Sequence, residues 1–125
     1  MVVVIMSLLL TALVSVLLGA LGQILWKQGL RVMEFDPSLF LSLSGLTKIL
    51  VNGWIPAGIV CYFLSMVLWL KALKLGELSY VYPLISLNFV ILTLAGYVIF
   101  SEEVTLTRIL GIALIILGIL VASRS

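Results

Sequence analysis

The sequence contains no histidine, only one cysteine and few charged residues: seven Lys and Arg against five Asp and Glu in 125 residues. Because Cys61 lies inside an apolar stretch and has no second thiol to pair with, neither a disulfide within the chain nor a zinc site can form. The net charge of +2 is dispersed, and no basic run indicates a nucleic-acid partner. These absences predict a protein without a metal, without a cofactor and without nucleic acid as a ligand.

Acidic side chains are missing from the long apolar stretches. A proton-coupled exporter of cations needs a buried acid that trades its proton for the substrate. Motifs of hydrolases, metalloproteases and thiol oxidoreductases (GxSxG, HExxH and CxxC) are also missing. The sequence therefore argues against a proton-coupled cation exporter and against an enzyme. The five acids lie at the ends of apolar stretches or in connections: Glu34, Asp36, Glu77, Glu102 and Glu103.

Apolar sequence makes up most of the chain, with 64% hydrophobic residues and a mean hydropathy of +1.40. A helix that crosses a bilayer needs about 20 mostly apolar residues. The first stretch lacks a positive n-region and is too long for the core of a signal peptide, so we expect it to be retained as a spanning helix. The sequence predicts an all-α integral membrane protein with a single domain, residues 1–125, and four transmembrane helices: Val2–Leu25, Trp54–Leu70, Ser79–Phe100 and Leu106–Ser123.

The one long connection, Arg31–Asn52, has an amphipathic pattern. Asp36 and Pro37 are typical of a helix start, with the acid as N-cap and proline at the first helical position. We predict an interfacial helix that lies along the membrane surface, with a membrane-dipping extension of the second span as the alternative. Its apolar side would hold Leu39, Leu43, Leu46 and Leu50, and its polar side Ser38, Ser42, Gly45, Lys48 and Asn52.

The other connections are short. The turn Lys74–Glu77 is tight, which makes the second and third spans antiparallel neighbours. Pro83 falls in the first two turns of the third span, where its missing N–H costs little. Thr105 or Thr107 can cap the fourth span.

Small residues recur on two of the predicted spans. Ser15, Gly19 and Gly22 form one stripe of the first span, where small side chains let another helix approach closely. Gly111 and Gly118 lie seven apart on one face of the fourth span. Two interpretations of this second pair stay open: contact between subunits, or tight packing within one chain.

Basic residues are spread almost evenly over the two ends of the predicted bundle. Orientation normally follows an excess of Lys and Arg on the cytoplasmic side. Either Lys27 lies inside its helix and should not be counted, or the chain inserts both ways and pairs as an antiparallel dimer. The end with both termini holds Lys71, Lys74 and Arg124, and the other end holds Lys27, Arg31, Lys48 and Arg108.

Two polar side chains lie near the end of the first span. Gln23 and Lys27 continue along roughly one face, one turn apart. The simple interpretation of Lys27 is a long amine that reaches the lipid headgroups. The functional interpretation is an ammonium that holds a phosphate, because polar groups inside a bilayer mark ligand pathways more often than in soluble proteins.

The third span carries most of the other polar candidates. Tyr82 and Ser86 are four apart and share a helix face, whereas Asn88 lies on another. An amide in an apolar run needs a partner, which is either a neighbouring helix or a ligand. Glu102 follows this span, where it either borders the fourth helix as a favourable N-terminal acid or takes part in transport.

With these residues the chain resembles the drug/metabolite transporter superfamily, at the four-helix size of the small multidrug resistance proteins. The likeness is greatest to the four-helix subunits of the undecaprenyl-phosphate-aminoarabinose flippase. Its most specific stretch is Tyr82–Val90, which reads YPLISLNFV. The other matching residues are Gly22-Gln23, Lys27-Gln28, Met66–Leu70, Thr93–Ala95, Glu102, Val104, Gly111 and Gly118.

The resemblance implies a flippase for a polyprenyl-phosphate-linked sugar or related anionic lipid in a bacterial cytoplasmic membrane. Such a protein would work by alternating access as a dimer, either with a second copy, in parallel or antiparallel orientation, or with a similar subunit. The essential acid of the drug-exporting branch aligns with Gly19, which agrees with the missing carboxylate. The implied substrate-binding residues are Gln23, Lys27, Tyr82, Ser86, Asn88 and Glu102, with Tyr82, Ser86 and Asn88 in the same cavity as Lys27 and Gln23.

Two rival functions remain at this stage. The first is an exporter of small cationic solutes with the same fold, against which the missing acid of the first span counts. The second is a non-transporting subunit that stabilises another membrane protein, in which every polar residue only joins helices.

Overall fold

The computed structural model describes residues 1–124, which contain helices and no strands. Four helical runs in this part of the chain are long and apolar enough to cross a membrane: Val2–Arg31, Trp54–Leu75, Leu78–Val98 and Leu106–Ser123. The predicted all-α integral membrane protein with four spans is therefore confirmed. The elements in order are α1 (Val2–Arg31), η1 (Pro37–Leu41), α2 (Leu43–Val51), α3 (Trp54–Leu75), α4 (Leu78–Val81), η2 (Tyr82–Ser86), α5 (Leu87–Val98) and α6 (Leu106–Ser123).

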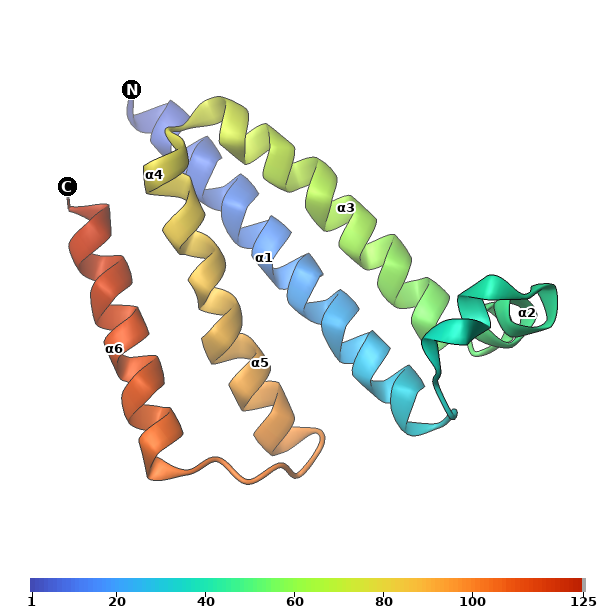
Figure 1. Ribbon diagram of the computed structural model, residues 1–125. Coiled ribbons are helices and arrows are strands. Elements are labelled where there is room, and N and C mark those ends of the chain that lie inside the picture. The colour runs from blue at the N-terminus through green and yellow to red at the C-terminus, as the bar shows by residue number, and fades with distance from the viewer. Residues whose placement is uncertain (125) are drawn as a thin grey trace.

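The spans lie side by side in the order α3, α1, α5, α6, with both chain ends at the same end of the bundle (Figure 1). The most extensive packing is between α1 and α3. Near the end that holds the termini, a small core is formed by Leu8 and Ala12 of α1, Ala72 of α3 and Val81 of α4. Helix α6 lies at the edge of the arrangement and has no buried residue.

The α1–α3 contact depends on small residues. Ser15 and Ser65 exchange hydrogen bonds, each hydroxyl donating to the other residue's carbonyl oxygen at 2.7 Å. About two helical turns after Ser15, a Cβ on Gly22 would lie 2.9 Å from the carbonyl oxygen of Gly58. The predicted small-residue stripe of the first span therefore faces α3 at the point of close approach.

Replacing Ser15 with alanine is expected to lower the free energy of unfolding by about 1 kcal/mol, because side-chain hydrogen bonds between membrane helices are of that size. The loss should show as a shift in an SDS titration followed by circular dichroism. Ser123→Ala is the matched control, since the Ser123 hydroxyl donates to the carbonyl oxygen of Leu120 in its own helix. An equal loss in both variants would contradict this role for Ser15.

The third span is not the continuous helix that the sequence predicted from Ser79 to Phe100. It begins at Leu78, is wound as a 3-10 helix over Tyr82–Ser86, and ends as an α-helix at Val98. Pro83 explains the change, because it has no N–H to donate and so breaks the α-helical hydrogen-bond ladder. The tighter winding changes which residues of this segment share a face.

The first connection also differs from prediction. Asp36 does cap a helix, accepting a hydrogen bond from the Ser38 N–H at 2.9 Å, but that helix is the short η1. A second helix, α2, begins after Ser42, whose hydroxyl accepts from the Gly45 N–H at 3.0 Å. The single amphipathic helix is therefore wrong in its continuity: Ser42 is extended and acts as a new N-cap.

Helix α2 is not one of the four spans. It lies beyond the end of α1 and α3, away from α5 and α6 (Figure 1). Its buried residues are Gly45 and Ile49, whereas Leu43 is 84% and Leu50 is 67% exposed. The leucine side is thus free to contact lipid, in agreement with the predicted amphipathic pattern. An interfacial position for this segment stays a prediction.

Helix α6 is capped as expected, with the Thr105 hydroxyl accepting from the Arg108 N–H at 3.2 Å. A Cβ placed on Gly111 or on Gly118 would meet no atom within 4 Å. These two glycines therefore do not tighten packing within the described part of the chain. The other interpretation of the pair, contact between subunits, stays a prediction.

Candidate functional site

A cavity of about 500 Å³ opens where α1, η2, α5 and the start of α6 meet. We call it the polar cavity, because charged and amide side chains line one part of its wall. Its lining residues are Gln23, Ile85, Asn88, Phe89, Leu92, Thr93, Glu102, Val104 and Arg108.

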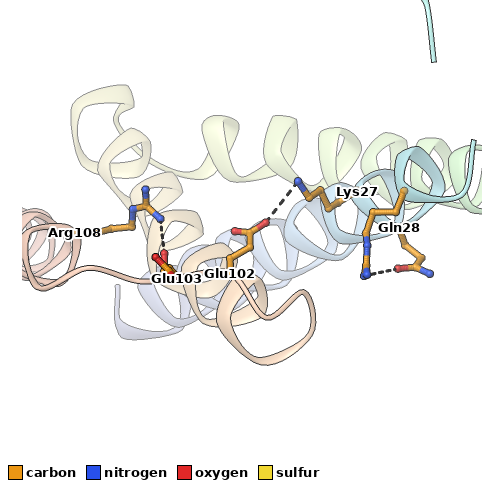
Figure 2. Close-up of polar contacts among 6 residues, drawn as sticks. Lys27, Gln28, Glu102, Glu103 and Arg108 are labelled. Atoms are coloured by element: carbon orange, nitrogen blue, oxygen red, sulfur yellow. Dashed lines mark hydrogen bonds and ion pairs between the residues drawn. The ribbon is translucent and has the colours of Figure 1, made fainter. Parts of the chain in front are cut away.

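An ion pair lies beside the polar cavity. The Nζ atom of Lys27 is 3.5 Å from Oε1 of Glu102, and the two side chains are 54% and 45% exposed (Figure 2). Lys27 comes from the last turns of α1 and Glu102 from the α5–α6 connection. Pairs this exposed contribute about 0–1 kcal/mol, so this one can open at little cost.

The backbone after α5 determines where the Glu102 carboxylate lies. Ser101 adopts a left-handed conformation with φ 54°, and the Glu102 N–H donates to the carbonyl oxygen of Gly96 at 2.9 Å. A Cβ on Gly96 would lie 2.6 Å from Oε2 of Glu102. The carboxylate therefore lies directly over the last turns of α5, in space that the missing side chain of Gly96 leaves open.

Arg108 adds a second cation that the sequence had not assigned to the site. It lines the polar cavity, and its Nη1 donates to the carbonyl oxygen of Glu103 at 3.2 Å (Figure 2). In the sequence Arg108 counted only toward the charge balance between the two ends. Its place in the first turn of the helix that follows Glu102 is the signal that could have identified it.

Asn88 lines the polar cavity and carries an unsatisfied acceptor. Its Oδ1 atom is buried and has no hydrogen-bond partner within residues 1–124. The same side chain also lines a smaller cavity of about 140 Å³ with Ser15, Gly19 and Trp69. The interpretation of this oxygen as part of a hydrogen bond between helices is therefore not supported in the single chain.

Tyr82 and Ser86 are not among the residues that line the polar cavity. Tyr82 is 56% exposed, and its ring packs edge-on against Trp69 of α3 with 6.3 Å between the ring centroids. Because a 3-10 helix has about three residues per turn, residues four apart no longer share a face there. The structure therefore brings Gln23, Asn88 and Glu102 together beside Lys27, and does not bring Tyr82 and Ser86 to them.

A second cavity, of about 420 Å³, adjoins the first between α5 and α6. Two residues, Thr93 and Val104, line both. We call it the apolar cavity, since its remaining lining residues are Val90, Leu94, Tyr97, Ile109 and Ile112. A polar and an apolar compartment thus share a wall.

Comparison with known proteins finds relatives that are named as flippase subunits. The chain is 38% identical over 117 residues to the probable 4-amino-4-deoxy-L-arabinose-phosphoundecaprenol flippase subunit ArnE of Yersinia pseudotuberculosis, covering 94% of this chain and 96% of the relative. It is 36% identical over 107 residues to the subunit of the same name from Pseudomonas fluorescens, covering 86% of this chain and 89% of the relative. No solved structure matches the chain.

These relatives are transporter subunits and not enzymes, in agreement with the missing enzyme motifs. The family model of the EamA-like transporters matches residues 2–124, which is nearly the whole chain. The helical membrane architecture and the four spans agree with both findings. The chain is therefore a multi-pass membrane protein that belongs to the EamA-like transporter family, within the drug/metabolite transporters.

Proposed function

We propose that this protein moves a polyprenyl-phosphate-linked sugar between the leaflets of a bacterial cytoplasmic membrane. The observation that carries the proposal is the shared wall of the polar and apolar cavities at Thr93 and Val104. A ligand that fits both compartments has a polar headgroup joined to an apolar chain. The relatives, which are named as flippase subunits for such a lipid, support this choice of ligand.

Within the polar cavity each polar group has a role in the proposal. Lys27 and Arg108 supply cations for the phosphate, because charge-assisted hydrogen bonds are the stronger kind. Gln23 and Asn88 supply amide groups for sugar hydroxyls. Tyr82 and Ser86 lie nearer the other end of the third span, so we assign them to the headgroup after it has crossed.

The proposed transport unit is a dimer, formed either with a second copy, in parallel or antiparallel orientation, or with a similar subunit. Helix α6 leaves its glycine face uncovered in the single chain, which supports an additional helix there. Rocking of one subunit against the other would then expose the headgroup site to each leaflet in turn, as in other transporters built from repeats.

Replacing Gly118 with leucine is expected to weaken dimerisation by about tenfold, because a large side chain keeps two helices apart. Folding of the single chain should not change, since a Cβ at this position meets nothing within 4 Å. The measurement is energy transfer between labelled chains in liposomes at increasing dilution. Ala113→Leu, on the opposite face of α6, is the control, and equal weakening in both variants would contradict a glycine-based contact.

Binding of the ligand tests the proposed function. The purified full-length protein is offered undecaprenyl phosphate carrying 4-amino-4-deoxy-L-arabinose and, separately, tetraphenylphosphonium, and retained ligand is measured by native mass spectrometry. We expect the lipid to be retained and the cation not to be. Retention of the cation alone would favour an exporter of cationic solutes, and retention of neither would favour a non-transporting assembly subunit.

A further inference from the structure

Two hydrogen-bond acceptors and two cations line or adjoin the polar cavity. The acceptors are the carboxylate of Glu102 and the buried Oδ1 atom of Asn88, which has no donor within residues 1–124. The cations are Lys27 and Arg108. A ligand that carries only a phosphate satisfies the cations and leaves the acceptors without a donor.

The position of Glu102 favours a cationic partner. Its carboxylate lies over Gly96, in the last turns of α5, where the helix dipole places its negative end. Lys27 provides this positive charge in the structure, with its Nζ atom 3.5 Å from Oε1 of Glu102. When Lys27 turns to a phosphate, Glu102 is left beside an anion with no counter-charge, and two like charges close together repel each other.

An ammonium group on the ligand resolves this conflict. It replaces Lys27 as the partner of Glu102 and donates to the orphaned oxygen of Asn88, while the phosphate takes Lys27 and Arg108. The ion pair between Lys27 and Glu102 then opens, and each member gains a partner of opposite charge on one ligand. The loose geometry and half-exposed side chains of the pair permit this exchange.

We propose that Glu102, assisted by Asn88, is the specificity-determining group that selects a headgroup bearing an ammonium over one whose sugar is uncharged. This inference rests on the proposed function, because it concerns the same headgroup site. It assigns opposite ends of a zwitterionic headgroup to opposite charges of the cavity. Lipids with the same phosphate and chain but no positive charge on the sugar are then poor ligands.

The test compares three lipids with one chain: undecaprenyl phosphate carrying 4-amino-4-deoxy-L-arabinose, the same lipid with its amine N-formylated, and undecaprenyl phosphate alone. Binding to the full-length protein in nanodiscs is measured for the wild type and for Glu102→Gln. Glu103→Gln is the matched control, because that neighbouring carboxylate does not line the polar cavity. Asn88→Leu removes the second acceptor and provides an independent variant should Glu102→Gln fold poorly.

We expect the wild type to prefer the amine over its N-formyl form by about tenfold, the usual size of a charge-assisted hydrogen bond. Glu102→Gln should bring this ratio close to one without weakening the binding of undecaprenyl phosphate, Asn88→Leu should lower the ratio several-fold, and Glu103→Gln should preserve it. A wild type that binds all three lipids equally, or a ratio unchanged in Glu102→Gln, overturns the inference and leaves the proposed function standing. A wild type that binds none of them overturns both.

Discussion

Replacing Lys27 with alanine is expected to weaken binding of the lipid-linked aminosugar by between about tenfold and a hundredfold. The side chain is the proposed partner of the phosphate, and its loss removes a charge-assisted hydrogen bond. The same change leaves Glu102 without the cation that lies 3.5 Å from it, so repulsion between carboxylate and phosphate adds to the loss. Isothermal titration in nanodiscs measures the change directly.

Two further variants separate these contributions. Lys71→Ala removes another exposed amine, at the other end of the bundle, and should bind as the wild type does. The double change Lys27→Ala with Glu102→Gln should bind undecaprenyl phosphate more tightly than Lys27→Ala alone, because the unpaired carboxylate is gone. Full binding by Lys27→Ala would show that the phosphate is held elsewhere.

The second large effect concerns Gly58, where α3 meets α1. A Cβ at this position would lie 2.5 Å from Cδ1 of Trp26 and 2.8 Å from the carbonyl oxygen of Gly22. Gly58→Leu must therefore displace Trp26, which donates to the carbonyl oxygen of Ile55 at 3.2 Å and stacks on Tyr62. We expect a loss of about 3 kcal/mol or more in the free energy of unfolding, at the upper end of overpacking effects.

An SDS titration followed by circular dichroism measures this loss. Gly111→Leu is the matched control, since it adds the same side chain at a helical glycine with no neighbour within 4 Å. Unfolding of the single chain should be unchanged in that control. If Gly58→Leu were as stable as the control, the close approach of α1 and α3 would be wrong.

Much of the fold could be predicted because membrane helices are encoded locally. The four spans follow from runs of apolar residues, and the caps at Asp36 and Thr105 follow from side chains next to the helices that they begin. The errors arose where two local signals compete. Pro83 winds its segment as a 3-10 helix, and Ser42 starts a new helix inside a longer amphipathic pattern.

The candidate site was less predictable because it depends on contacts between distant segments. Lys27 and Glu102 were both recognised as candidates, but no local pattern indicates that residues 75 positions apart in the chain form a pair. Arg108 was missed since its charge was weighed only for membrane orientation. Tyr82 and Ser86 were grouped with Asn88 only through the family resemblance, which does not show that the chain is wound as a 3-10 helix over Tyr82–Ser86.

Transport of the lipid is the most direct test of the central claim. The full-length chain, purified with any subunit that stays bound to it, is reconstituted into vesicles that contain undecaprenyl phosphate carrying 4-amino-4-deoxy-L-arabinose in both leaflets. A membrane-impermeant amine reagent then labels the lipid that reaches the outer leaflet. We predict that labelling in these vesicles proceeds to nearly all of the lipid and that Lys27→Ala slows it, whereas labelling that stops at the outer-leaflet fraction of protein-free vesicles would contradict the account.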